Sequence, residues 1–142
     1  MARRLPLTPL LALALLSGLG LLAAACGGED EPTASGSLGP VTQADADRAV
    51  LALCETAEAT DLAAAAAPFH NRAHQTLHAI AAATEERDRA AAADLLAAKQ
   101  RVEADLAETD LPPGFADDVE ALLGATRAAL DAIGLDAPAC PA

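Results

Sequence analysis

The sequence predicts an all-α fold, a small four-helix up-down-up-down bundle, over residues 42–142. Apolar residues recur there at intervals of three and four, the spacing that places them on one face of an α-helix. Four such stretches are separated by short segments rich in proline, glycine or helix-capping residues. No stretch alternates apolar and polar residues as a half-buried strand does. Short connections favour antiparallel neighbours, which gives the up-down order.

The first two helices are expected on either side of a turn at residues 64–67. Thr42 suits an N-cap, and the apolar stripe after it predicts a helix over residues 43–64. Pro68 suits the first turn of a second helix that ends near residue 83. The two stripes are Val50, Leu53, Ala57 and Ala64, and then Phe69, Ala73, Leu77 and Ile80.

The third and fourth helices are separated by a proline-rich break. Thr84 or Asp88 caps the third helix, and residues 110–114 interrupt the chain before the fourth. Gly134 stands where a C-terminal glycine cap belongs. The stripes are Ala92, Leu95, Val102 and Leu106, and then Phe115, Val119, Leu122, Ala129 and Ile133.

The core between these helices is expected to be thin. The chain has two Phe, no Trp and no Tyr, and alanine fills many inward-facing positions. Burial stabilises by about 25 cal/mol per Å2, so small side chains contribute little each. Such a core is marginal for a domain of about 100 residues, and a further source of stability is expected.

The start of the chain has the pattern of a secretory signal. Arg3 and Arg4 precede an uncharged apolar run that ends in Ala24, Ala25 and Cys26. This end resembles the lipobox of bacterial lipoproteins, in which small residues precede a cysteine that is diacylglycerol-modified and becomes the first residue after cleavage. The family usually has Leu three residues before the cysteine, whereas this chain has Ala23.

The resemblance implies a signal peptide over residues 1–25, a lipidated Cys26 and a palmitate-type anchor on the extracytoplasmic side of the cell membrane. Residues 27–41 are rich in Gly, Ser, Pro and acids, and predict a flexible tether with a maximum reach of about 50 Å. Two alternatives compete. An ordinary signal-peptidase site at residues 23–25 would leave a soluble protein with a free thiol, and the apolar run could stay as a membrane span.

The three cysteines favour the lipoprotein interpretation. Lipidation of Cys26 leaves Cys54 and Cys140 as a pair, whereas either alternative leaves an odd thiol in an oxidising compartment. In the expected topology the tail after the fourth helix is long enough to return along the first helix to Cys54. We therefore expect a structural disulfide; a redox switch is the alternative, without a C-x-x-C motif to support it.

The net charge excludes one class of partner. Removing residues 1–25 takes two of the nine basic residues, which leaves seven against 21 acidic residues, a net charge of −14. Nucleic-acid binding needs basic surface to neutralise phosphates, so no nucleic acid is expected. Adsorption onto anionic lipid is equally disfavoured, so the acyl chains must hold the protein at the membrane.

His70, His74 and His78 are the feature with most chemical potential. Their spacing of four residues places them along one stripe of the second helix. A pair at this spacing can chelate one metal ion. Reflecting the second helix about the expected 64–67 turn places Asp61 beside His70 and Glu58 beside His74.

Two histidines and two carboxylates would suit Zn, Cu(II), Mn or Fe as a divalent transition metal cofactor. The other interpretations are hydrogen bonds between the histidines and nearby carboxylates, or solvated histidines. The motif lacks the glutamate of metallopeptidases, and the chain has no nucleophile–base pair or glycine-rich phosphate loop. We therefore expect no enzyme, but a structural or protein-interaction domain with an envelope protein as partner; metal handling is the alternative.

Overall fold

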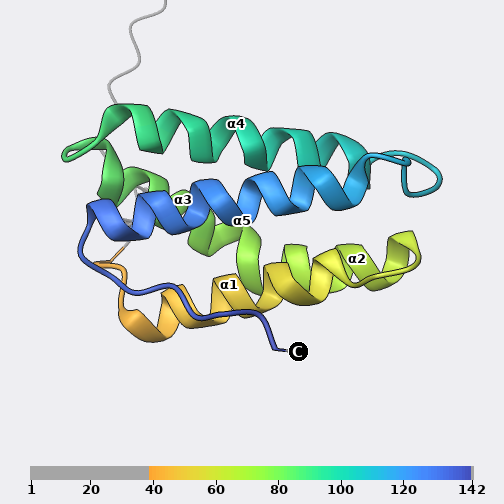
Figure 1. Cartoon of the computed structure of the whole chain (residues 1–142), viewed down its shortest axis with the longest axis horizontal. Coiled ribbons are helices and arrows are strands. Elements are labelled where there is room, and N and C mark those ends of the chain that lie inside the picture. The colour runs from red at the N-terminus through yellow and green to blue at the C-terminus, as the bar shows by residue number, and fades with distance from the viewer. Residues whose placement is uncertain (1–38, 142) are drawn as a thin grey trace, which may run out of the picture. The chain divides into compact units, whose positions relative to one another are not determined.

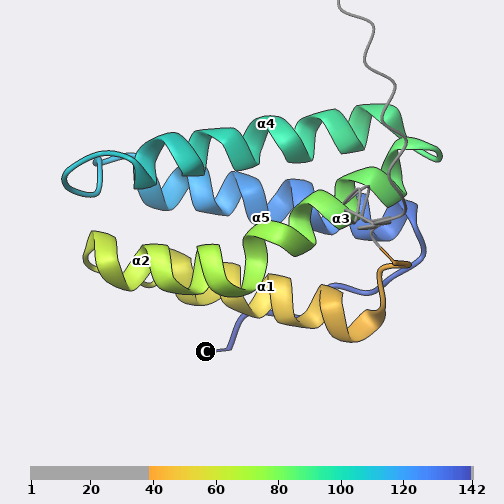
Figure 2. The same ribbon diagram turned by 180° about the vertical axis from the view of Figure 1, so that it is seen from behind.

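A computed structural model describes residues 39–141, and all regular structure in that range is helical (Figure 1). The expected all-α bundle is confirmed: four helical segments run alternately up and down (Figures 1 and 2). The second segment consists of α2, a π-helical turn η1 and α3, which follow one another without a break. The elements are α1 (Gln43–Ala57), α2 (Leu62–Pro68), η1 (Phe69–Ala73), α3 (His74–Glu85), α4 (Arg89–Leu106) and α5 (Phe115–Ala132).

The first helix is shorter than the apolar spacing predicts, because α1 ends at Ala57 and not near residue 64. Asp61 starts a new helix: its Oδ1 accepts a hydrogen bond of 2.9 Å from the backbone N–H of Ala64. Ala57 precedes this break and the alanines at 63–67 follow it. Alanine favours helix, so the apolar spacing predicted a single helix across a real turn. The turn between the first two segments therefore lies at residues 58–61.

The second segment begins at Leu62, before Pro68 rather than at it, so the expected role of this proline is wrong. Proline has no N–H and its ring crowds the carbonyl four residues earlier, which disturbs a regular helix. The chain widens into η1 directly after Pro68, where the backbone N–H of His74 bonds to the carbonyl of Phe69, five residues back. Figure 2 shows the chain stepping here from the level of α2 to that of α3.

The remaining helix ends follow the sequence closely. Thr42 and Asp45 form a capping box at the start of α1. Asp88, and not Thr84, caps α4, with its Oδ1 accepting 2.9 Å from the N–H of Ala91. Gly134 has φ +76°, the left-handed conformation that a helix-ending glycine adopts.

The core is as rich in alanine as the sequence suggests. Three threonines are also buried, and each hydroxyl donates to the carbonyl four residues earlier at 2.7–2.8 Å, so all three hydroxyls have a partner. Thr84 Oγ1 also lies 3.1 Å from the carbonyl of Ala129 and links α3 to α5. The largest fully buried apolar side chains are Phe69, Leu53, Leu77, Ile80, Leu95, Leu122, Leu130, Val50, Val102 and Val119.

The tail that follows α5 runs back along α1 (Figure 1). Gln43 holds its start: the side-chain Nε2 donates to the carbonyl of Asp136 at 2.8 Å, and Oε1 accepts from the N–H of Asp136 at 3.1 Å. A disulfide between Cys54 and Cys140 holds its end, with a Cα–Cα distance of 5.5 Å. The expected pairing of these two cysteines is confirmed.

Candidate functional site

The three histidines lie along one face of the second segment, with His70 in η1 and His74 and His78 in α3. The ring centroids of His74 and His78 are 5.1 Å apart, and those of His70 and His74 are 6.0 Å apart. The buried Phe69 ring packs edge-on against His70 and His74. The expected stripe is present, and its middle member, His74, is the most enclosed.

Two residues of α4 complete this face. Glu103 Oε1 lies 2.8 Å from His74 Nε2 and 2.7 Å from Lys99 Nζ, so one carboxylate oxygen serves both groups. The Lys99 side chain is 3% exposed, whereas those of Glu103 and His74 are 29% and 33% exposed. Lys99 is the one buried charged residue within the described part of the chain.

The sequence does not mark Lys99 and Glu103 as a site, because a lysine and a glutamate four residues apart are typical of a solvent-exposed helix face. A signal was present: Lys99 continues the buried stripe of Leu95 and Val102 with the spacing of four and three residues. A lysine on that stripe needs a counter-ion. Glu103, one turn later, supplies it.

The electrostatics of the face follow from this shared carboxylate. Burial alone would raise the pKa of Glu103, but the hydrogen bonds and charges of Lys99 and His74 hold the pKa below its usual value. Burial, followed by the nearby Lys99 and His74, lowers the pKa of His78, and Glu103 opposes that effect only in part. The face therefore favours an ionised Glu103 and a neutral His78.

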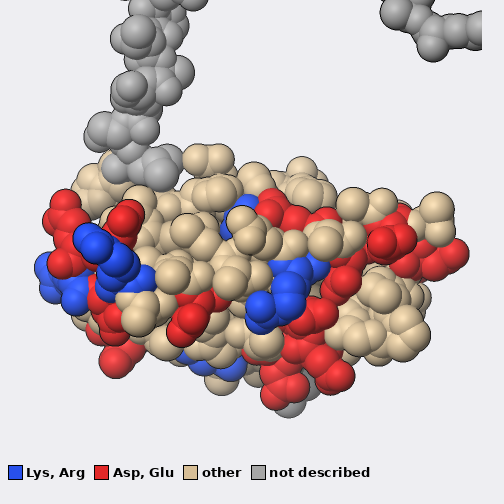
Figure 3. Space-filling model, turned by 90° about the horizontal axis from the view of Figure 1, so that it is seen from above, with Lys and Arg blue, Asp and Glu red and all other residues tan. Residues whose placement is uncertain are grey.

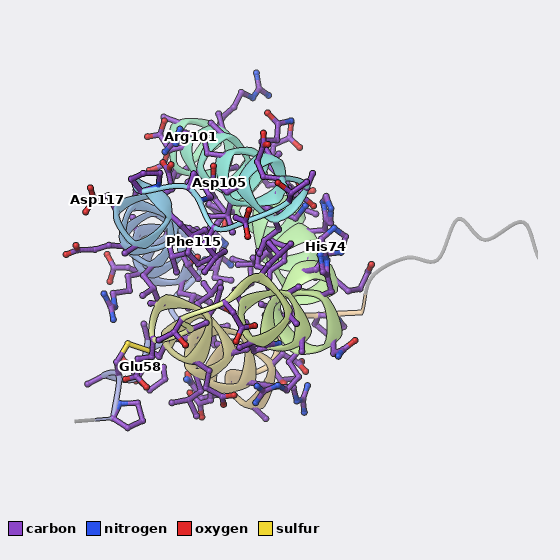
Figure 4. The ribbon with its side chains drawn as sticks, turned by 90° about the vertical axis from the view of Figure 1, so that its right-hand side faces the viewer. Glu58, His74, Arg101, Asp105, Phe115 and Asp117 are labelled. Atoms are coloured by element: carbon purple, nitrogen blue, oxygen red, sulfur yellow. A yellow bond between two sulfur atoms is a disulfide. The ribbon has the colours of Figure 1, made fainter. Side chains whose placement is uncertain are left out.

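The carboxylates expected as metal ligands lie elsewhere. Glu58 follows the last residue of α1, and Asp61 caps α2, because the turn is at residues 58–61. In the end view of Figure 4, Glu58 and His74 lie on different sides of the bundle. The ligand set of His70, His74, Glu58 and Asp61 is therefore not assembled. No group of three or more His, Cys, Asp or Glu side chains between residues 39 and 141 is placed to hold a metal ion.

A shallow pocket of about 270 Å3 opens beside His78, between α3 and α4. Most of its lining is apolar, and its two acidic or basic residues, Glu85 and Arg89, lie on either side of the α3–α4 turn. Its lining consists of His78, Ala81, Ala82, Glu85, Arg89, Ala92, Ala93 and Leu96.

A second polar cluster joins α4 and α5 near the opposite end of the bundle. Arg101 Nε lies 3.1 Å from Asp118 Oδ1. Burial and the neighbouring Asp118 carboxylate raise the pKa of Asp105, whose Oδ2 is buried without a hydrogen-bond partner in the described chain. Figure 4 shows Asp105 and Phe115 between the helices, whereas Asp117 points outward. On the face of Figure 3, the far right end carries acidic side chains without basic ones.

The anchor expected at Cys26 lies outside the described residues. No helix within residues 39–141 is long and apolar enough to cross a bilayer. No protein family, curated protein sequence or solved structure was found to match this chain.

Proposed function

We propose that the chain is an exported lipoprotein, held by a lipid on Cys26 at the extracytoplasmic side of a membrane. The observation that carries the proposal is the Cys54–Cys140 disulfide. It accounts for two of the three cysteines and leaves Cys26 as the one available for acylation. A disulfide of this kind belongs to an oxidising, extracytoplasmic compartment.

The bundle is proposed to be a non-enzymatic domain with a structural or protein-interaction role. Glu103 is occupied by Lys99 and His74, which makes this polar cluster a structural tie between α3 and α4. The acidic balance of the chain favours an envelope protein as partner over nucleic acid or an anionic lipid surface.

Metabolic labelling with an alkyne palmitate analogue tests the anchor. We expect the full chain to be labelled and membrane-bound, and Cys26→Ser to lose both label and membrane association. Cys140→Ser is the matched control, because it also replaces one cysteine with serine but should keep the label. Labelled, membrane-bound Cys26→Ser protein would exclude lipidation at this residue.

Metal binding is the second candidate function, and the close packing of the His74 and His78 rings favours it. The nearest carboxylate is Glu103, which Lys99 already neutralises. Lys99→Met would free Glu103 as a third ligand, and we expect this variant to bind Zn2+ more tightly than the natural chain in calorimetric titration. If neither protein binds Zn2+, and Cu2+ and Mn2+ also fail, metal handling is excluded.

A further inference from the structure

The two sulfurs of the disulfide differ in their access to solvent. Cys54 lies in α1 with 2% of its surface exposed, whereas Cys140 is exposed in the tail. A thiolate attacks a disulfide sulfur in line with the S–S bond, from the side opposite the sulfur that leaves. Attack on Cys54 would have to come from the core, but Cys140 can be reached from solvent.

A cation stands beside the accessible sulfur. Arg127 Nη2, on α5, lies 3.9 Å from Cys140 Sγ. Arg127 is exposed and forms no salt bridge with any carboxylate among residues 39–141. In a strongly acidic chain, this guanidinium offers local attraction to an approaching thiolate and to the negative charge shared by the sulfurs during exchange.

We propose that Cys140 is a thiol-exchange site of this protein, and that Arg127 is the residue that assists attack there. An external thiolate forms a bond to Cys140 Sγ as the Cys54–Cys140 bond breaks. The electron pair leaves on the Cys54 sulfur, which takes a proton from water. With a dithiol reductant, the second thiolate then displaces Cys140, so the reductant is oxidised to its disulfide and both cysteines end as thiols.

Exchange at Cys140 would change how the tail is held. The remaining ties are the two hydrogen bonds between Gln43 and Asp136 and the partly buried Leu135 and Ala137. These weaker contacts leave the end of the tail free to move from α1. The state of Cys140 therefore sets whether α1 stays covered along this edge.

The test uses the oxidised full-length protein and 2-mercaptoethanol, with acid quenching and non-reducing peptide mass spectrometry. We expect the first adduct on Cys140 and a free thiol on Cys54. Arg127→Ala should slow its formation by about two- to five-fold, the range for one exposed charge interaction. Arg127→Lys should restore most of the rate. Arg87→Ala, which changes the net charge equally at another exposed arginine, should leave the rate unchanged.

A first adduct on Cys54 would overturn the proposal. Equal rates for Arg127→Ala and Arg87→Ala would remove the role of Arg127. Exchange that proceeds only at the rate of global unfolding, measured in parallel by denaturant dependence, would show that the folded protein does not present Cys140 for attack.

Discussion

The two sides of the bundle are stabilised by different chemistry. Between α3 and α4, one carboxylate oxygen of Glu103 contacts both the buried Lys99 and His74. Between α1 and the tail, the Cys54–Cys140 disulfide and two hydrogen bonds between the Gln43 side chain and the Asp136 backbone hold the chain. A charge pair acts only while both partners are ionised, whereas a disulfide is insensitive to pH and salt but yields to thiols. Both supplement a core that is rich in alanine, and different perturbations should separate their contributions to the free energy of unfolding.

Loss of the disulfide is expected to have the largest effect. Its two cysteines are 86 residues apart in the sequence, and closing a loop of that length lowers the entropy of the unfolded chain. The chain-entropy treatment gives about 4–5 kcal/mol, as an upper bound. Cys140→Ser should lower the free energy of unfolding in urea by most of this amount, because Cys140 itself is exposed and contributes little packing.

Reductant supplies the control for that substitution. With dithiothreitol present, the natural chain and Cys140→Ser should unfold at nearly the same urea concentration. A difference that persists in reductant would show that the substitution acts through local packing and not through the cross-link.

Breaking the charge pair on the other side should have the next largest effect. Glu103→Ala leaves the buried Lys99 ammonium without its counter-ion. The cost should be about 1–3 kcal/mol, below that of a fully buried pair because Glu103 is partly exposed. Lys99→Met should be nearly neutral, because an apolar side chain of similar length suits this core position. Urea unfolding at neutral pH measures both.

Glu103→Ala and Lys99→Met together show whether the ion pair itself stabilises the fold or only neutralises a buried charge. If Lys99→Met destabilised as strongly as Glu103→Ala, the ion pair itself would be a net source of stability. In that case both the disulfide and the Lys99–Glu103 ion pair would contribute directly to the free energy of unfolding.

The helix caps should contribute smaller amounts, similar to one another. Asp61→Ala and Asp88→Ala each remove a side-chain acceptor from a helix N-terminus and should cost about 1 kcal/mol. Asp61 also tests the corrected helix boundary. In an uninterrupted helix over residues 43–64, alanine at position 61 would instead stabilise, because alanine has the higher helix propensity.

The sequence predicted most of the fold because helix periodicity and caps are local signals. Thr42 and Gly134 show the ends of their helices by residue type, and the number of cysteines predicts the Cys54–Cys140 pair. The break before Asp61 was missed because alanine is compatible with helix on both sides of a turn. Because the expected turn was at residues 64–67 and the real one is at 58–61, Glu58 and Asp61 were also wrongly expected beside the histidines.

The true partners of the histidine face depend on packing between helices, which the sequence specifies less directly. The contact of His74 with Glu103 joins residues 29 positions apart, on two helices whose relative rotation sets which side chains meet. Local spacing could mark Lys99 as an unusual charged residue on a buried stripe. It could not show that His74 contacts the same Glu103 carboxylate as Lys99 does.

The smallest expected effect is the pH response of the α3–α4 side. The lowered pKa of His78 means that the folded protein binds a proton at this group less readily than the unfolded chain. Stability should therefore fall as pH decreases below about 6.5, the usual histidine pKa, and His78→Gln should flatten that part of the profile. Because His78 is largely exposed, the expected change in melting temperature is small. Thermal unfolding between pH 8 and 5 measures it.

Glu103 and Asp105 extend the profile in opposite directions. The lowered pKa of Glu103 predicts a further loss of stability below about 4.5, where its ionised form is consumed. The raised pKa of Asp105 predicts a gain in stability as pH falls, because protonation removes a charge that burial and the nearby Asp118 carboxylate disfavour in the folded state. Asp105→Asn should therefore steepen the acid loss, whereas His78→Gln reduces it. Identical profiles for the two variants would show that neither group governs the response, and that the acid sensitivity comes from the many surface carboxylates.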